Sequence, residues 1–308
     1  EAEMITGSIQ EKTIKNKIIE KSKNNILLLA TPPCQGFSTL VAATKAEDFE
    51  KDQRNFLIYD TFDIIDSLDF DCVLIENVPR FLKMLHPYKG DFATIQEIIT
   101  DKYSNRYQLS FDIFDAKDYK VPQFRKRAVI KMFKKSYRWP DPKKYKEITL
   151  EDAIGHLPSL ESGEDSGIKH HISKVHNDRE VTAMKHTPTG QSAFKNRIHY
   201  PKKINGDKVS GFHNTYKRLE WNKPCKARTT NNGNIGSHNN VHPGRKLKNG
   251  TYSDSRVLTL LELFIVSSLP LNWRIPEWAS ENLVRQVVGE GVPPKMMYEI
   301  LKALKKND

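Results

Sequence analysis

Short apolar runs alternate with stretches of helical periodicity between residues 26 and about 135, and this alternation constrains the fold more than any other feature. The strand candidates are ILLLA (26–30), CVLIENV (72–78), YQLSFDIF (107–114) and RAVIKMF (127–133), and the helical stretches are 54–68 and 81–99. The continuous apolar runs ILLLA and CVLI indicate strands that are buried on both faces. Strands that alternate with helices predict an α/β domain with a largely parallel sheet.

The chain changes character after this region. Residues from about 160 to 255 are rich in Lys, Asn, His, Gly and Thr and lack long apolar runs, but interspersed aromatic residues favour a small folded module with long loops. Helical patterns return at 257–270 and 293–306. We therefore predict a catalytic domain over 1–155, a loop-rich domain over 156–255, and a segment over 256–308 that returns to the first domain.

Charge and cysteine content limit the classes of function. The sequence has 49 Lys and Arg against 38 Asp and Glu, a net charge of +11, which favours polyanionic partners such as nucleic acid. No apolar run approaches the roughly 18 residues of a membrane span. Three cysteines without a CxxC pair argue against a disulfide framework or a structural zinc site, and we predict no metal.

Cys34 follows the first strand candidate, in the stretch TPPCQGFS. Pro32 and Pro33 cannot continue a central strand, since proline brings no N–H to the ladder. Cys34 is therefore expected on a loop just past the carboxyl end of a strand, where open α/β sheets bind their ligands. From this stretch alone, a buried structural cysteine and a nucleophile remain equally open.

Charged residues mark two further positions. Glu76 ends the second strand candidate, at the same edge of the sheet as Cys34, where partial desolvation would suit it to proton exchange; an ion-paired surface glutamate is the alternative. Arg125 and Arg127 lie two apart on an extended segment and should point to one face. Two guanidinium groups there would hold a phosphate or a base edge, or lower the pKa of a thiol.

Together these stretches resemble the cytosine-C5 DNA methyltransferases. PPCQGFS is similar to the nucleophile motif of that family, ENV (76–78) to its proton-donor motif, and QFRKR (123–127) to its Q-x-R-x-R motif. DQRNFL (52–57), SRVLT…SSLP (255–270) and GEGVPP (289–294) resemble three more motifs, all in the family's order. The resemblance covers most of residues 26–308. It implies the Rossmann-like fold of S-adenosylmethionine-dependent methyltransferases, with a target-recognition domain inserted.

The resemblance also implies a mechanism. Cys34 adds to C6 of a cytosine that is flipped out of the duplex, Glu76 contacts N3, Arg125 supports the base, and Arg127 assists. S-adenosylmethionine then gives its methyl group to C5. The implied cofactor contacts are Ile9, Pro33, Leu57, Glu290 and Val292. The implied DNA contacts are Gln35, Ser38, Gln123, Arg228, Thr229 and Thr230, of which the last three lie in KPCKARTTNNG (223–233), a stretch that resembles the family's K-P-x-x-T-I-T-T.

One family motif is missing. The glycine-rich F-x-G-x-G strand that holds S-adenosylmethionine is absent before ILLLA, Ser8 stands where the next motif commonly has aspartate, and Glu290 stands where asparagine is frequent. The missing strand would lie beside ILLLA, so residues 1–308 alone should leave an unpaired apolar edge and bind the cofactor poorly. A cofactor-binding segment or subunit is thus an expected partner, besides double-stranded DNA and a companion restriction endonuclease.

Two rival functions remain open at this stage. A tRNA cytosine methyltransferase of the same superfamily would resemble this chain around Cys34, although such enzymes usually have Thr where Ser38 stands. A non-catalytic DNA-binding subunit would explain the missing motif, but it would not need Cys34, Glu76 and Arg125 together. The preferred prediction is the modification enzyme of a restriction–modification system, acting in a prokaryotic cytoplasm in association with the nucleoid.

Overall fold

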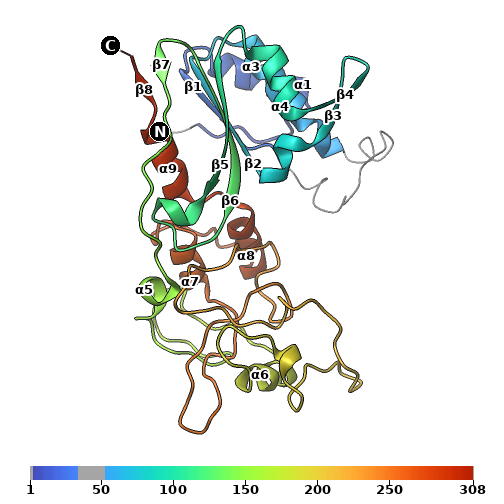
Figure 1. Cartoon of the computed structure of the whole chain (residues 1–308), viewed down its shortest axis with the longest axis vertical. Coiled ribbons are helices and arrows are strands. Elements are labelled where there is room, and N and C mark those ends of the chain that lie inside the picture. The colour runs from blue at the N-terminus through green and yellow to red at the C-terminus, as the bar shows by residue number, and fades with distance from the viewer. Residues whose placement is uncertain (1–2, 34–52, 308) are drawn as a thin grey trace. The chain divides into compact units, whose positions relative to one another are not determined.

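The computed structural model describes residues 3–33 and 53–307, and the chain divides into two compact units (Figure 1). Unit 1 comprises residues 1–114, 126–142 and 302–308; unit 2 comprises residues 115–125 and 143–301. Compactness therefore groups residues 256–301 with the loop-rich segment. The three functional segments proposed from the sequence stay a prediction.

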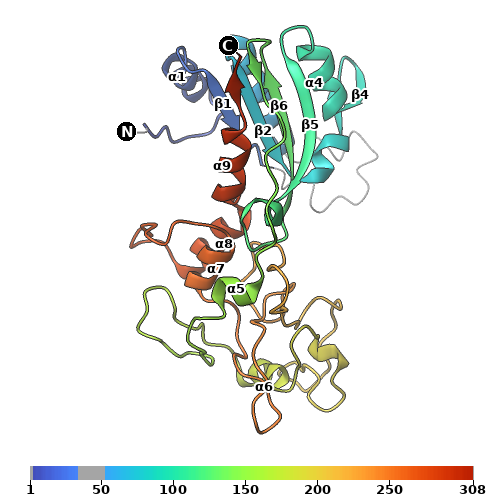
Figure 2. The ribbon, with the colours of Figure 1, turned by 60° about the vertical axis from the view of Figure 1, so that its left-hand side comes forward.

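Unit 1 is built on a four-stranded sheet in the order β1-β2-β6-β5, with helices packed against it (Figure 2). Its elements are α1 (Lys12–Lys21), β1 (Leu27–Ala30), the 3-10 helix η2 (Gln53–Phe56), α3 (Leu57–Ser67), β2 (Cys72–Asn77), the 3-10 helix η3 (Pro79–Lys83), β3 (Leu85–Tyr88), β4 (Asp91–Thr94), α4 (Ile95–Tyr103), β5 (Gln108–Asp115), β6 (Lys126–Phe133), β7 (Tyr137–Arg138) and β8 (Lys305–Lys306). The predicted α/β class is confirmed.

The described sheet is mixed, whereas the sequence favoured largely parallel pairing. β1 runs parallel to β2, with Leu27 opposite Cys72, but β6 runs antiparallel to β2, with Phe133 opposite the same cysteine. The chain reaches β6 from β5 through residues 116–125, which contain one 3-10 helix and no crossover helix. Two consecutive strands can run parallel only if a long crossover, usually a helix, connects them. The apolar content of a strand does not show whether such a crossover is present.

Helices α3 and α4 supply the main core of unit 1. Phe62 and Ile65 of α3 and Ile98 of α4 pack with Val73 and Ile130 of the sheet, all of them buried. These residues recur at helical spacing on their helices and at alternate positions on their strands. Each element therefore turns one apolar face to the common core.

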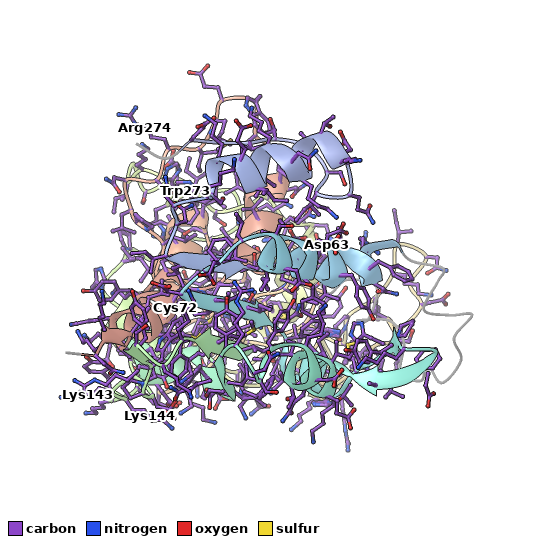
Figure 3. All side chains as sticks on the ribbon, turned by 90° about the horizontal axis from the view of Figure 1, so that it is seen from above. Asp63, Cys72, Lys143, Lys144, Trp273 and Arg274 are labelled. Atoms are coloured by element: carbon purple, nitrogen blue, oxygen red, sulfur yellow. The ribbon has the colours of Figure 1, made fainter. Side chains whose placement is uncertain are left out.

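Helix α1 is fastened to α3 by an ion-pair group. Lys15 contacts Asp60 at 2.6 Å and Asp63 at 2.7 Å. Asp63 is labelled on α3 in Figure 3. Burial opposes the lysine charge, but the hydrogen bonds to both carboxylates outweigh it and raise the pKa of Lys15. No residue of α1 is fully buried, so this contact and a few half-buried isoleucines hold the helix.

The helix expected over 81–99 is wrong for residues 81–94. The chain instead forms the 3-10 helix η3 and the hairpin β3–β4, and α4 begins only at Ile95. Lys89 and Gly90 both have positive φ, +50° and +84°, which is the conformation that a two-residue hairpin turn needs. Pro87 also disfavours a continuous helix, and Thr94 starts α4 with a capping box to Glu97.

Strand β1 differs from the buried strand that its sequence suggested. It pairs with β2 on one side, and within the described residues its other edge has no strand partner. Ile26 remains 57% exposed and Leu29 45% exposed. An apolar strand at the edge of a sheet leaves backbone hydrogen-bonding groups and apolar surface open together. This agrees with the open edge expected from the missing glycine-rich motif.

Unit 2 has little regular structure, as its composition predicted. Its elements are the 3-10 helix η4 (Ala116–Tyr119), α5 (Leu150–Ile154), α6 (Asp178–Lys185), the 3-10 helix η5 (Ala193–Lys195), α7 (Leu260–Val266), α8 (Glu281–Glu290) and α9 (Pro294–Lys302), whose last residue is grouped with unit 1. Helix α7 is shorter than the apolar stretch 257–270, because a capping box between Thr259 and Glu262 starts it late.

Candidate functional site

The loop that leads to Cys34 is tied to the end of β2. Asn77, the last residue of β2, donates a hydrogen bond from Nδ2 to the backbone oxygen of Pro32, with a distance of 2.9 Å. Its Oδ1 accepts from the backbone N–H of Val78 at 2.8 Å. The two strand ends are therefore held side by side at one edge of the sheet. Cys34, Gln35 and Ser38 themselves lie outside the described residues.

Glu76 is buried beside Asn77 and forms an ion pair. Its Oε1 is 2.8 Å from Nε of Arg127 on β6, and both side chains are largely removed from solvent. Glu76 and Arg127 belong to neighbouring antiparallel strands, and register places Glu76 opposite Val129. The arginine is therefore a diagonal neighbour across the ladder. An oriented, partly desolvated carboxylate of this kind suits contact with a ring nitrogen.

Arg125 has a different environment from the one predicted. Its buried guanidinium donates to the backbone oxygens of Arg228 at 2.9 Å, Gly289 at 2.8 Å and Glu290 at 3.0 Å. Its backbone N–H donates to Oδ1 of Asp115 at 2.9 Å. These contacts lie in unit 2, whereas the Glu76 contact of Arg127 lies in unit 1. The described contacts thus give the two guanidinium groups different partners.

The carbonyl groups at the end of α8 are good partners for Arg125. The last turn of a helix leaves backbone oxygens without helical donors and carries partial negative charge. Arg125 satisfies two of these oxygens and, through Arg228, reaches the segment that carries Thr229 and Thr230. It therefore acts as a clamp between α8 and the candidate DNA-contact segment.

A close backbone approach reinforces this clamp. A Cβ atom added to Gly289 would lie 2.2 Å from the backbone oxygen of Thr229, so only glycine fits there. Asn232 donates to the backbone oxygens of Thr229 and Arg285, each at 2.7 Å. Sequence reasoning missed Asn232 and Arg285. The asparagine-rich stretch RTTNNGN was the available signal, because asparagine side chains commonly bond to neighbouring backbone groups.

The residues predicted to contact DNA divide into buried and exposed groups. Gln123 is buried and donates to the backbone oxygen of Val266 at 3.1 Å. Arg228 is 2% exposed, and its guanidinium donates to the backbone oxygens of Lys226 at 2.9 Å and Asn239 at 2.7 Å. These bonds favour a structural role for both side chains. Thr229 and Thr230 are exposed, as DNA contact requires.

The predicted cofactor contacts are distributed over both units. Ile9 is partly buried against the core of unit 1, Leu57 is half-buried at the start of α3, and Pro33 is exposed at the last described position before Cys34. Glu290 ends α8, where its Oε1 accepts from Gln286 at 3.0 Å, and Val292 is half-buried. Each position offers a polar atom or an apolar surface that a nucleoside-type cofactor can use.

A buried charge network supports α7 and was not anticipated. Arg256 contacts Glu262 at 2.8 Å and Asp254 at 2.9 Å, and His242 lies 3.6 Å from each carboxylate. Burial alone would raise the pKa of Glu262, but the Arg256 charge outweighs it and lowers this pKa to about 2. Burial lowers the pKa of His242 to about 4. Burial also opposes the charge of Asp254, yet its neighbours keep that pKa below its usual value.

The two described thiols are inert. Cys72 and Cys225 are fully buried, and burial raises the pKa of Cys72 to about 12 and also raises the pKa of Cys225. A thiolate is the reactive form of cysteine, so neither residue is a nucleophile at neutral pH.

Comparison with known proteins identifies the class of this molecule. The family model described as C-5 cytosine-specific DNA methylase matches residues 1–306. The chain belongs to this family. It is 43% identical over 303 residues to the Type II methyltransferase M1.HgaI of Avibacterium volantium, covering 98% of this chain and 85% of that protein. It is 26% identical to M1.HphI of Haemophilus parahaemolyticus, covering 91% of this chain and 68% of the relative.

Two solved structures of other proteins share the fold. A protein described as a DNA modification methyltransferase encoded within a prophage, from E. coli, superposes with a TM-score of 0.65 at 20% identity over 96% of this chain and 84% of that one. Spodoptera frugiperda DNMT2 gives a TM-score of 0.57 at 15% identity, with 93% and 81% covered. These two likenesses show the methyltransferase fold. The activity class, DNA (cytosine-5)-methyltransferase, follows from the family model and the 43% identical relative. Among the described residues, no helix is long and apolar enough to cross a bilayer.

Proposed function

We propose that this chain methylates C5 of a cytosine flipped out of a specific duplex site, with Cys34 as the nucleophile. The observation that carries the proposal is the Asn77–Pro32 hydrogen bond, which holds the approach to Cys34 at the strand end that also bears Glu76. A nucleophile and a proton-exchanging carboxylate at one sheet edge form the pair of groups that the reaction needs.

The residues then have the following roles. The Cys34 thiolate forms a bond to C6 of the cytosine, and the carboxyl group of Glu76 holds a proton at N3 so that the ring accepts the electron pair. Arg127 orients Glu76 through their ion pair. S-adenosylmethionine supplies the methyl group to C5. Loss of the C5 proton to water returns the C5–H electron pair to the ring, the C6–S bond breaks to release the Cys34 thiolate, and the N3 proton returns to Glu76.

Arg125 contributes indirectly in this proposal. By binding Gly289, Glu290 and Arg228 it fixes the carboxyl end of α8 and the segment that presents Thr229 and Thr230. We propose that these two threonines, with Gln35 and Ser38, contact double-stranded DNA. Exposed hydroxyl and amide groups are common partners of phosphates and base edges.

The residues predicted to bind the methyl donor offer part of what a nucleoside-type cofactor needs. Ile9, Pro33 and Leu57 offer apolar surface, and Glu290 and Val292 offer a carboxylate and a turn, so the residues present fit part of the cofactor. The exposed apolar edge of β1 is where a further strand would pair. We propose that a glycine-rich segment, from the same protein or from a second subunit, pairs with β1 and completes the site.

We further propose a place in a restriction–modification system. The support is the 43% identity to a protein named as a Type II methyltransferase. In that setting a companion endonuclease cuts the same DNA site when it is unmethylated. The protein would then act in the prokaryotic cytoplasm, in association with the nucleoid.

Covalent trapping tests the proposal. The chain is incubated with S-adenosylmethionine and a sequence-diverse pool of duplexes that contain 5-fluorocytosine, with and without an added glycine-rich segment, and peptides are examined by mass spectrometry. Fluorine at C5 blocks the final elimination, so a productive enzyme stays linked to its DNA. We expect the adduct on Cys34 and none on Cys72 or Cys225. The Cys34→Ser variant should still bind DNA but form no adduct.

Each outcome separates the alternatives. An adduct only with the added segment supports both the mechanism and the completed sheet. An adduct without the segment supports the mechanism and rejects the need for a further strand. No adduct under either condition favours the non-catalytic DNA-binding subunit, and an adduct only with a matched RNA pool would favour a tRNA methyltransferase.

A further inference from the structure

A basic hairpin in unit 2 is not explained by the catalytic proposal. We call residues 196–212 the 196–212 arm; it follows η5 and is yellow in Figure 1. Lys202 pairs with Lys208 across the hairpin, and the backbone N–H of Val209 donates to the oxygen of Pro201 at 3.0 Å. Gly206 has a φ of +88° at the tip, where an added Cβ would meet nothing within 4 Å. The tip therefore projects from its surroundings.

The base of the arm is firmly anchored. Tyr200 stacks on Phe194 with ring centres 5.3 Å apart, and its hydroxyl donates to the backbone oxygen of Val209 at 3.0 Å. His199 stacks on His186, just after α6, with ring centres 3.5 Å apart. Asn196 Nδ2 donates to the backbone oxygen of His186 at 2.9 Å. Because these contacts already order its base, the arm should lose little conformational entropy when it binds a partner.

The 196–212 arm combines apolar and cationic groups. Ile198, Ile204 and Phe212 are 81%, 87% and 70% exposed. The arm carries four basic residues, Arg197, Lys202, Lys203 and Lys208, against one acidic residue, Asp207. Within the described part of the chain, none of these four cations forms an ion pair. Single exposed apolar residues are ordinary, but three on one short cationic hairpin indicate an interaction surface.

The chemistry of the arm fits duplex DNA better than a protein partner. Lysines on both strands of the hairpin match the phosphates that border a groove, and a two-stranded ribbon fits into the major groove. Isoleucine at the tip suits the apolar contact that the thymine methyl group offers. A purely apolar protein interface would not require unpaired cations, whose burial would be costly.

We propose that the 196–212 arm enters a DNA groove beside the methylated cytosine. Lys202, Lys203 and Lys208 bind phosphates, and Ile204 contacts base edges and helps to select the sequence. This inference rests on the proposed function in that it requires duplex DNA as the substrate, but it assigns a specific element that neither the motifs nor the catalytic residues identify.

The first test measures phosphate contacts in the whole chain. The variant combines Lys202→Ala, Lys203→Ala and Lys208→Ala, and the matched control combines Lys12→Ala, Lys17→Ala and Lys23→Ala, which removes the same charge from exposed positions on or next to α1. The slope of log Kd against log salt concentration should become shallower by about 2 to 3 for the arm variant, since each phosphate contact contributes about 0.9. The control should keep the wild-type slope.

The second test measures sequence selection. Duplexes trapped from the 5-fluorocytosine pool are sequenced for the wild type and for the Ile204→Ser variant. We expect the variant to lose about tenfold in preference at one or two base pairs beside the methylated cytosine, with adduct still forming at saturating DNA. Ile204 is almost fully exposed, so the variant should fold like the wild type, which a thermal melt checks.

The outcomes distinguish the two proposals. If the wild type traps no DNA even with the added glycine-rich segment, the proposed function fails. If the wild type traps DNA but the lysine variant keeps the wild-type salt slope and Ile204→Ser keeps the wild-type sequence preference, only the arm inference is overturned. Arm variants that change self-association while leaving both DNA readouts intact would also overturn it, in favour of a protein-binding surface.

Discussion

Asn77 at the end of β2 donates a hydrogen bond to the backbone oxygen of Pro32, two residues before Cys34. This single contact joins the proton-donor motif to the nucleophile loop, although 45 residues separate the two positions in sequence. Parallel pairing of β1 with β2 makes the contact possible, because both strands end at the same edge of the sheet. In the proposed mechanism, Asn77 is therefore a positioning residue for Cys34.

Replacing Asn77 tests this relationship. Asn77→Ala removes the bond to Pro32 and should lower methyl transfer on the order of 100-fold through misplacement of the nucleophile. It should cost only about 1–3 kcal/mol of unfolding free energy. Single-turnover kinetics and urea denaturation measure the two effects, with Asn16→Ala on the exposed face of α1 as the control. Transfer within twofold of the wild type would contradict the positioning role.

The Glu76–Arg127 ion pair should be strongly coupled. In a double-mutant cycle with Glu76→Gln and Arg127→Met, we expect a coupling free energy on the order of 1–3 kcal/mol in stability, because both groups are desolvated. The pair Lys89–Asp101 is solvent-exposed and provides a control cycle that should show no measurable coupling. Equal coupling in both cycles would mean that burial does not strengthen the Glu76 contact.

Gly289 should not tolerate a side chain. Gly289→Ala forces a methyl group against the backbone of Thr229. We expect the unfolding free energy to fall by about 2 kcal/mol or more. We also expect weaker DNA binding, because the segment with Thr229 and Thr230 would be displaced. Gly291→Ala is the matched control, since its Cβ meets the nearest atom at 3.2 Å and its φ of −59° suits any residue. Differential scanning calorimetry compares the two variants. Similar melting temperatures for both would contradict the close approach of Gly289 to the Thr229 backbone.

Stability should fall on mild acidification. The folded-state pKa of His242 is about 4, below its ordinary value of 6.5, so between these pH values the unfolded chain binds more protons. The unfolding free energy therefore decreases as pH falls from 6.5 to 4, by up to about 1.4 kcal/mol per pH unit for this group. Burial also lowers the pKa values of His86 and His176 to about 4, so both residues add to the pH dependence of the unfolding free energy.

Substituting His242 isolates its share of that slope. The unfolding free energy of His242→Gln is measured by urea denaturation at several pH values between 7 and 4. Its dependence on pH should be weaker than that of the wild type by the uptake of about one proton. His213→Gln, at an exposed position, should match the wild type. An unchanged slope in His242→Gln would show that this imidazole is not held neutral. Below pH 4 a second loss is expected, because Glu262 has a pKa near 2 and its stabilising charge disappears as it is protonated.

The sequence by itself determined the α/β class, the strands of the main sheet and the family. The apolar runs CVLIEN and RAVIKMF predict strands directly, and both are buried, although the similar run ILLLA forms an edge strand that stays partly exposed. The order of the motifs around Cys34, Glu76 and Arg127 indicates the family, and the catalytic roles of these side chains are proposed from that resemblance. The β3–β4 hairpin was missed, since a Lys89–Gly90 turn inside an apolar stretch is a weak local signal.

Only the tertiary structure decided what each arginine does. Arg125 and Arg127 look equivalent in QFRKR, yet one bonds to the end of α8 and the other to Glu76. Likewise, Arg228 and Thr229 are neighbours in one motif, but the guanidinium is buried and the hydroxyl is exposed. Sequence records which groups are present, whereas the partners of Arg127 and Arg125 lie 51 and up to 165 residues away, and only folding brings them into contact.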